Sequence, residues 1–377
     1  MRVVIAPDSF KGTASAADVA RAVADGWRSE RPDDDLVILP MADGGEGTID
    51  AVATAVPGSE RVPVTVTGPD DRPVETAWLR LPDGRALVEL AATSGLTLLD
   101  HPRPDAAHTT GFGQAIAAAL DAGATGLLLG IGGSASTDGG IGALRALGLA
   151  VGTSVPADAT GGAMLDHVPP VDTTALRTLP PLGAVVLSDV TSPLLGEHGA
   201  AAVFGPQKGV TPDRVAVHED RLRRWSECFP DIDAATPGAG AAGGTGFGLL
   251  AWGAVLASGA TTIADAIGLS DAVARADLVI TGEGCFDAQS AAGKAPAVVR
   301  ALAEDLGTPT ALVAGSVAAP VDGFALAASL TVIATQTTGE PDDALRDPLR
   351  FARIAGARFA RAQDARPAAP SRSGSAR

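Results

Sequence analysis

The stretch VVIAPDSFKGTASAADVARAVADGWRSE, residues 3–30, decides the fold of this chain. It opens with a β-branched apolar run, which predicts a buried strand over 2–6 that ends at Pro7. Small and apolar residues then recur at helical spacing after Ser15, a residue type that caps helices, and this predicts a helix over 15–30. A strand followed at once by an amphipathic helix favours a parallel sheet with helices packed on it.

The same alternation continues and is then interrupted. A second strand is predicted at 36–40 and a second helix at 46–56, whereas the short strands between 62 and 91 are joined by Pro/Asp/Gly turns typical of antiparallel hairpins. From residue 277 the β-α alternation returns. We therefore predict an α/β protein with two α/β domains, a discontinuous Rossmann-like domain interrupted by a larger inserted mixed α/β domain, and a ligand cleft between them. The expected bounds are 1–62 with 262–364 for the Rossmann-like domain, 63–261 for the inserted domain and 365–377 for a disordered tail.

Composition excludes several classes of protein. The 377 residues are 46% hydrophobic, enough for more than one core. With 28 basic and 44 acidic residues the net charge is −16, which argues against nucleic-acid binding through a basic face. The N-terminal apolar run is broken by Pro7 and Asp8, and no apolar stretch reaches the roughly 18 residues of a membrane span. We expect a cytoplasmic protein that binds neither nucleic acid nor membrane, with its oligomeric state left open.

Four polar, glycine-rich loops directly follow predicted strands. They lie in VVIAPDSFKG (3–12), ILPMADGGEGT (38–48), LLLGIGGSASTDGG (127–140) and LVITGEGCFDAQS (278–290). Exposed backbone N–H groups before a helix suit a phosphate, and carboxylates in the same loops suit Mg²⁺. The four aspartates of these loops, Asp8, Asp43, Asp138 and Asp287, therefore predict the walls of a phosphoryl-transfer site.

Each of these features also has a purely structural explanation. Acidic residues in the first turn of a helix can stabilise its dipole without any chemistry, and Lys208 in FGPQKG (204–209) could be a solvated lysine at a turn.

Asp189 ends the strand AVVLSD (184–189), and an acid at the carboxyl end of a strand in an α/β fold commonly faces the ligand crevice. The sequence contains no GxSxG, CxxC or HExxH motif, which argues against hydrolase and zinc chemistry.

Eight motifs in a fixed order carry a family resemblance. They are APDSFKG, PMADGGEGT, VELAATSGL, GIGGSASTDGG, DVTSPLLG, FGPQKG, GAAGGTGFG and DLVITGEGCFDAQSAAGKAP. Over nearly its whole length the chain resembles the bacterial type-1 glycerate kinase family. The resemblance implies phosphorylation of D-glycerate by ATP with Mg²⁺, generally at the 2-hydroxyl, and two α/β domains of which one is discontinuous. Three positions depart from the pattern: Thr137 and Ser192 stand where Asn is common, and Cys285 stands where Arg is common.

Individual roles follow from residue type and position rather than from the resemblance. Asp189 is the predicted general base, with Asp43 as the second candidate, because phosphoryl transfer needs a group that accepts the hydroxyl proton. Glu283 and Asp287 are the predicted Mg²⁺ ligands, and the cation for the glycerate carboxylate is Lys208 or Lys294. The predicted phosphate- and nucleotide-binding residues are Lys11, Ser9, Gly44, Gly45, Gly132, Gly133 and Ser134.

Two alternative functions remain open. One is a kinase for a related small hydroxy acid, with the same fold and an altered carboxylate pocket. The other is a catalytically inactive regulator that binds a metabolite. The acids Asp43, Asp189 and Asp287 argue against the regulator, since a protein that only binds anions gains nothing from buried carboxylates.

Overall fold

The computed structural model describes residues 1–152, 159–167, 170–287 and 294–364. Part of the fourth glycine-rich loop, with Gln289 and Ser290, and the predicted tail 365–377 lie outside the described residues. The chain forms two compact units. The first unit comprises Met1–Pro40, Gly268–Ala292 and the chain from Pro296, and the second comprises Met41–Ile267 with Gly293–Ala295.

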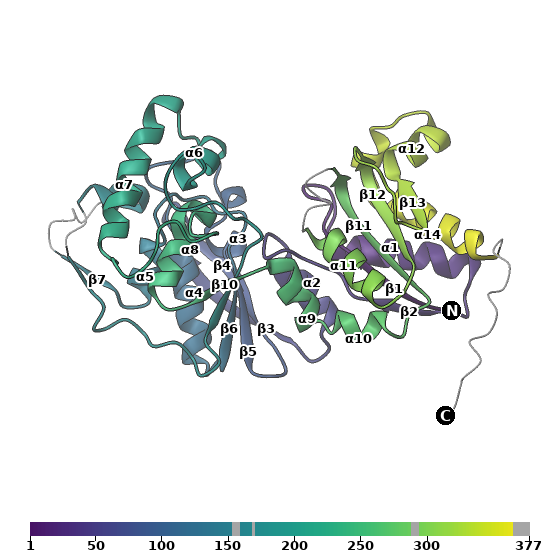
Figure 1. The fold of residues 1–377 in the computed structure, drawn as a ribbon, viewed down its shortest axis with the longest axis horizontal. Helices are drawn as coiled ribbons and strands as arrows, with labels where there is room; N and C mark the ends of the chain where they lie inside the picture. The colour runs from purple at the N-terminus through teal and green to yellow at the C-terminus, as the bar shows by residue number, and fades with distance from the viewer. Residues whose placement is uncertain (153–158, 168–169, 288–293, 365–377) are drawn as a thin grey trace. The chain divides into compact units, whose positions relative to one another are not determined.

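The first unit contains a five-stranded, fully parallel sheet in the order β13-β12-β11-β1-β2 (Figure 1). Its strands are β1 (Arg2–Pro7), β2 (Asp35–Ile38), β11 (Leu278–Phe286), β12 (Thr310–Val317) and β13 (Leu326–Ser329). Its helices are α1 (Ala16–Glu30), α10 (Leu269–Val273), α11 (Ala295–Asp305), α12 (Leu330–Thr338), α13 (Asp343–Arg346) and α14 (Pro348–Asp364). Side chains of α1, α12 and α14 share one apolar core with one face of β1, β11 and β12.

Helix α1 begins as the sequence predicts. The Ser15 hydroxyl accepts the Asp18 N–H at 3.1 Å, and Val19, Val23 and Trp27 are fully buried. The glycine in this helix allows a close crossing. A Cβ placed on Gly26 would lie 1.8 Å from the carbonyl oxygen of Arg353 in α14. The two helices therefore pack backbone to backbone.

The second unit contains a six-stranded mixed sheet in the order β10-β9-β6-β5-β4-β3. Its strands are β3 (Glu60–Thr67), β4 (Pro73–Arg80), β5 (Arg85–Glu89), β6 (Gly126–Gly130), β9 (Ala184–Leu187) and β10 (Val255–Ala257), and a separate pair joins β7 (Ala150–Val151) to β8 (Val171–Asp172). Its helices are α2 (Thr48–Ala55), α3 (Ala91–Ser94), α4 (Thr110–Asp121), α5 (Ile141–Ala146), α6 (Ala200–Phe204), α7 (Val215–Glu227), α8 (Ala241–Ala251) and α9 (Gly259–Ala266). Short 3₁₀ turns lie at Leu96–Leu98, Gly161–Asp166, Pro206–Lys208 and Pro212–Arg214.

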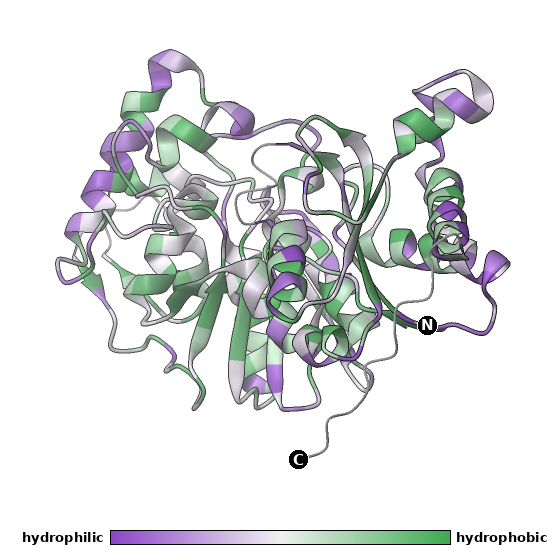
Figure 2. Ribbon diagram, turned by 45° about the vertical axis from the view of Figure 1, so that its right-hand side comes forward, coloured by the Kyte–Doolittle hydropathy of each residue, from purple (hydrophilic) through white to green (hydrophobic). Residues whose placement is uncertain are grey.

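The pairing in this sheet changes direction once. Strands β3, β4 and β5 pair antiparallel, as the hairpin turns predict, whereas β5, β6, β9 and β10 pair parallel. Hydropathy is highest along the strands and on the helix faces that pack against them (Figure 2). The core of this unit includes Trp78, Phe112, Trp225 and Phe247. No helix among the described residues is both long enough and apolar enough to cross a bilayer.

The structure confirms an α/β protein with two large sheets, one parallel and one mixed. The boundaries between the two units differ from those predicted. The first boundary follows Pro40 rather than residue 62, because the loop and helix that come next are hydrogen-bonded to β5. The second follows Ile267 rather than residue 261. The reason is that the N–H groups at the start of α9 donate to the carboxylate of Asp189, which lies just past β9. Hydrogen bonds between residues far apart in sequence thus place residues 41–62 and 262–267 in the second unit, whereas hydrophobic periodicity alone assigned them to the first.

Two local predictions were wrong. The run LTVIAT, residues 330–335, has the β-branched apolar character that predicts a strand, but it begins α12, since a short run of this kind does not distinguish strand from helix. The glycine-rich stretch 238–248 argues against an ordinary helix interior, and the apolar run LLAWGAVLASG, residues 249–259, predicts a buried helix. Instead α8 spans Ala241–Ala251, interrupted by left-handed backbone at Ala242, Gly243 and Gly244, and Val255–Ala257 forms β10.

We expect Gly26→Ala to destabilise the protein by roughly 1–3 kcal/mol, because the added methyl group would force α1 away from α14. Urea denaturation would measure this. Ser29→Ala, on the exposed face of the same helix, serves as the control and should change stability by no more than about 0.5 kcal/mol. Equal midpoints for the two variants would contradict the close crossing.

Candidate functional site

The predicted residues of the first unit gather at the carboxyl ends of β1 and β11. Pro7 and Gly282 are partners in the sheet, and the Asp8 N–H donates to the Gly282 carbonyl at 2.8 Å. Asp8 and Glu283 are each only 6% exposed. The Asp8 carboxylate accepts the Ser9 N–H at 2.6 Å. Two buried carboxylates therefore lie on neighbouring strands, Asp8 just past the end of β1 and Glu283 within the last four residues of β11, near the edge where an α/β sheet presents its functional groups.

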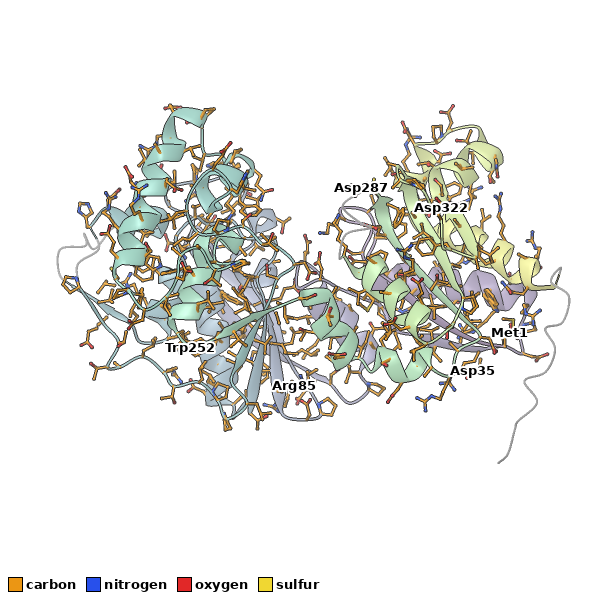
Figure 3. The ribbon with its side chains drawn as sticks, viewed as in Figure 1. Met1, Asp35, Arg85, Trp252, Asp287 and Asp322 are labelled. Carbon is orange, nitrogen blue, oxygen red and sulfur yellow. The ribbon has the colours of Figure 1, made fainter. Side chains whose placement is uncertain are left out.

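The remaining predicted residues are Lys11 and Asp287 of this unit and Lys294, which is grouped with the second unit. Lys11 is exposed in a tight turn that Phe10 closes by pairing with Ala14. Asp287 lies just past the end of β11 (Figure 3). Lys294 directly precedes α11 and is partly buried. Within the described part of the chain, no group of three or more His, Cys, Asp or Glu side chains could hold a metal ion on its own.

In the second unit, three loops meet in backbone contact. The Gly132 N–H donates to the Gly44 carbonyl at 3.0 Å. A Cβ on Gly44 would lie 2.7 Å from atoms of Leu187, and one on Gly132 would lie 2.6 Å from the Gly45 Cα. Glycine is therefore required for the packing of the loops. The contact brings the loop that carries Asp43 to the carboxyl ends of β6 and β9.

The protein's own carboxylates bind several N–H groups of the loop that contains Asp43. The Gly45 N–H donates to Asp43 Oδ1 at 3.0 Å. The Gly47 and Ile49 N–H groups each donate to the Glu89 carboxylate at 3.0 Å. The structure thus gives Gly44 a packing role and Gly45 an internal partner, which weakens the prediction that these two glycines bind phosphate.

The loop after β6 differs, because two of its N–H groups are open. Within the described residues, the N–H groups of Gly133 and Ser134 donate no hydrogen bond, although Ser134 as a whole is only 6% exposed. Gly133 is exposed and has a φ of 73°, so the backbone turns there at no steric cost. Adjacent open N–H groups in such a turn are a recurrent anion-binding arrangement. Of the predicted phosphate ligands in this unit, these two retain the donors that the role needs.

Asp138, predicted to be a wall of the site, is instead part of its framework. The side chain is fully buried, and its carboxylate accepts five hydrogen bonds. The donors are the N–H groups of Thr109, Gly140 and Gly142 and the hydroxyls of Thr109 and Ser136. A carboxylate so fully engaged holds the glycine-rich loop and the start of α5 in place.

Asp189 follows β9 and binds the start of α9. Its two carboxylate oxygens accept the N–H groups of Gly259 at 2.9 Å and Ala260 at 3.3 Å. Burial of the carboxylate raises the pKa of Asp189, and the negative charge of Asp43 adds to that increase. The two candidate bases are therefore near neighbours, and part of Asp189 remains exposed to solvent.

Lys208 is not a solvated lysine at a turn. The residue is 2% exposed, and its Nζ donates to the Ser136 carbonyl. Burial lowers the pKa of Lys208 to about 7, although the nearby charge of Asp138 opposes the shift. The structure therefore places this predicted substrate ligand beneath the glycine-rich loop rather than at the surface.

Glu89 is a residue of this region that sequence reasoning missed. It ends β5, is 5% exposed and joins that strand to α2. Burial raises the pKa of Glu89 to about 7, against the effect of its two backbone hydrogen bonds. The signal was available, because the rule that drew attention to Asp189 at the end of a strand applies equally to Glu89 in VELAATSGL.

The positions that depart from the family pattern have different surroundings. Thr137 is buried, and among the described residues its hydroxyl has no hydrogen-bond partner. Cys285 is exposed on β11, and Ser192 accepts the N–H groups of Gly238 and Gly240 through its backbone carbonyl. Only at Thr137 does the replacement leave a polar group buried and unsatisfied.

Comparison with known proteins identifies the family. The model of the glycerate kinase family matches residues 3–362, nearly the entire described chain. The chain belongs to the glycerate kinase family. It is 40% identical over 329 residues to glycerate 2-kinase of Escherichia coli (strain K12), covering 84% of this chain and 85% of that protein. It is also 40% identical over 327 residues to glycerate kinase of Bacillus subtilis (strain 168), again with 84% and 85% coverage.

A solved structure in the family has the same fold. The crystal structure of a protein of Salmonella typhimurium LT2, provisionally named glycerate kinase 2, matches with a TM-score of 0.84 and 38% identity. The match covers 97% of this chain and 98% of that one. The resemblance read from the eight sequence motifs is thus confirmed, and with it the prediction of a glycerate kinase.

We expect Glu89→Gln to flatten the pH dependence of stability. The folded-state pKa of about 7 lies above the ordinary value of 4.5, so the native state holds a proton that the unfolded chain has lost. This contribution is fully present below pH 4.5 and is lost as pH rises through 7, by up to about 3 kcal/mol. Urea unfolding at pH 5 and pH 8 should show a larger loss for the wild type than for the variant. An identical loss in both would contradict the assignment.

Proposed function

We propose that this protein transfers the γ-phosphoryl group of ATP to the 2-hydroxyl of D-glycerate. The observation that carries the proposal is the family match over residues 3–362. The relative named glycerate 2-kinase supports the choice of hydroxyl. The retained acids and open N–H groups described above supply the chemical groups that such a transfer needs.

The reaction needs charge stabilisation more than covalent chemistry. In our proposal the open N–H groups of Gly133 and Ser134 bind phosphoryl oxygens, and the exposed Lys11 adds a cation. Lys294 is the better candidate for the glycerate carboxylate, because Lys208 is buried. Local donors of this kind must act against the unfavourable field of a chain with net charge −16.

The donor set of the first unit suits Mg²⁺, a hard cation that binds oxygen and usually takes one or two carboxylates together with substrate phosphates. Glu283 and Asp287 would hold it, beside the buried carboxylate of Asp8. Bound there, the ion would neutralise phosphate charge during the transfer. The chain's own part is to present these carboxylates from β11 and from the residue that directly follows it.

Asp189 is the proposed general base. Its raised pKa and partial exposure suit a group that takes a proton near neutral pH. The carboxylate accepts two backbone N–H groups and a side-chain hydrogen bond from Ser258, which orients the group and leaves one acceptor position for the substrate hydroxyl. Asp43, whose carboxylate is held by the Gly45 N–H, is the alternative base.

The overall proposal is tested by an ADP-release assay with D-glycerate, L-glycerate, tartronate and glycolate. We expect turnover with D-glycerate to exceed the others. The phosphorylated position is tested by adding enolase alone to the product, since enolase dehydrates 2-phosphoglycerate but not 3-phosphoglycerate. Preference for another hydroxy acid would support the alternative kinase, and no turnover with any of the four would support the regulator.

We expect Asp189→Asn to lower kcat by roughly two to four decades, the range for loss of a general base. Asp43→Asn, which removes a neighbouring charge of the same sign, is the matched comparison and should lower kcat less. Melting temperatures must be measured alongside, because Asp189 also holds the start of α9. If Asp189→Asn turns over normally and Asp43→Asn does not, the two roles are exchanged.

A further inference from the structure

Lysine is rare in this chain, and its positions are informative. Of the 28 basic residues other than histidine, 25 are arginine and only three are lysine: Lys11, Lys208 and Lys294. All three lie in the glycine-rich motifs. The chain therefore uses an ammonium group, a compact point charge rather than a planar guanidinium, only within these motifs.

Lys208 is also an incompletely satisfied buried cation. Its ammonium has three N–H donors, and within the described residues the one acceptor it reaches is the Ser136 carbonyl. Lysine is almost never fully buried unless paired, because the burial of an unpaired charge costs several kcal/mol. The nearby carboxylate of Asp138 does not pair with it, as its hydrogen bonds go to five other donors.

Arg221 provides a contrast within the same unit. It is also buried, but its guanidinium pairs with the carboxylates of both Asp105 and Asp166. That arrangement is typical of a structural ion pair. Lys208 has no such carboxylate partner among the described residues, so its burial is not explained by charge pairing.

The surroundings of Lys208 explain why an ammonium is used. A Cβ on Gly243 would lie 2.9 Å from the Lys208 Nζ and 2.1 Å from the Ser136 carbonyl oxygen. Gly243 has a φ of 68°, so its backbone is turned directly against the ammonium group. The Gly243 backbone therefore lies close beside Nζ, and we expect the bulkier guanidinium of arginine to clash with it.

The same carbonyl links Lys208 to the open N–H groups. The Ser136 carbonyl also accepts the Ser134 hydroxyl at 3.4 Å, and the Ser136 N–H donates back to that hydroxyl at 3.2 Å. These bonds close a tight turn whose preceding N–H groups, at Gly133 and Ser134, are open. The Lys208 ammonium thus holds one end of this turn through its hydrogen bond to the Ser136 carbonyl.

We propose that Lys208 is a positioning residue: its ammonium holds the Ser136 carbonyl, and so fixes the turn that presents the Gly133 and Ser134 N–H groups to the transferred phosphoryl group. This inference rests on the proposed function and extends it. Lys208 itself contacts no reacting atom. Because these donors act most strongly on charge that develops during the transfer, their misplacement lowers kcat more than it weakens substrate binding.

The test is Lys208→Met, which removes the ammonium at similar side-chain volume. We expect kcat to fall by about 100-fold, with KM for ATP and for D-glycerate within about threefold of the wild type. The melting temperature should be unchanged or higher, because the lysine charge has no partner that offsets its burial. The control is Arg221→Met, which breaks a paired buried cation; it should lower the melting temperature and leave kcat near the wild-type value.

A second readout does not depend on turnover. Hydrogen–deuterium exchange of a peptide that covers residues 127–140 should be faster in Lys208→Met than in the wild type. If the wild type turns over none of the four hydroxy acids, the proposed function fails, while the exchange result still decides the role of Lys208. Lys208→Arg should not restore kcat, because we expect the guanidinium to clash with the Gly243 backbone.

Three results would overturn the proposal: a Met variant with kcat within threefold of the wild type, one that fails to fold, or exchange rates equal to those of the wild type. Recovery of kcat in Lys208→Arg would also overturn it, since the positive charge alone would then be sufficient.

Discussion

The second unit depends on carboxylates that bind backbone N–H groups at the starts of helices. Asp138 holds the start of α5, Glu89 the start of α2 and Asp189 the start of α9. The first N–H groups of a helix have no partner inside it, and the helix dipole favours a negative charge there. Each of these acids comes from the end of a strand or from a glycine-rich loop. The same interaction therefore joins the sheet to its helices and fixes the loops at the edge of the sheet.

This use of carboxylates limits where an anionic substrate can bind. Helix starts and glycine-rich loops are common phosphate sites, but here the protein's own acids occupy several of them. Among the described residues of the glycine-rich loop after β6, the N–H groups of Gly133 and Ser134 are therefore donors that the protein's own acids do not occupy. They lie in a chain with 16 more acidic than basic residues, so local geometry rather than overall charge must attract the substrate.

The sequence predicted the family correctly, whereas the roles of the individual site residues stay predictions. Motif order identified the family, and the end-of-strand rule correctly placed Asp189 at the carboxyl end of β9. The same reasoning could not separate Asp43 from Asp138, although one is partly exposed and the other is saturated by five hydrogen bonds. Residue type states what a side chain can bind. Its partners depend on segments distant in sequence, such as Thr109 for Asp138.

The sequence by itself determined the α/β class, the capped start of α1 and the family, because hydrophobic period, capping residues and motif order are local properties of the chain. Only the tertiary structure decided that the chain between 41 and 62 belongs to the second unit, that Glu89 holds α2 and that Lys208 is buried. Each of these depends on a contact between residues tens of positions apart. Such contacts form only when the sheet brings the strand ends together, and periodicity carries no information about them.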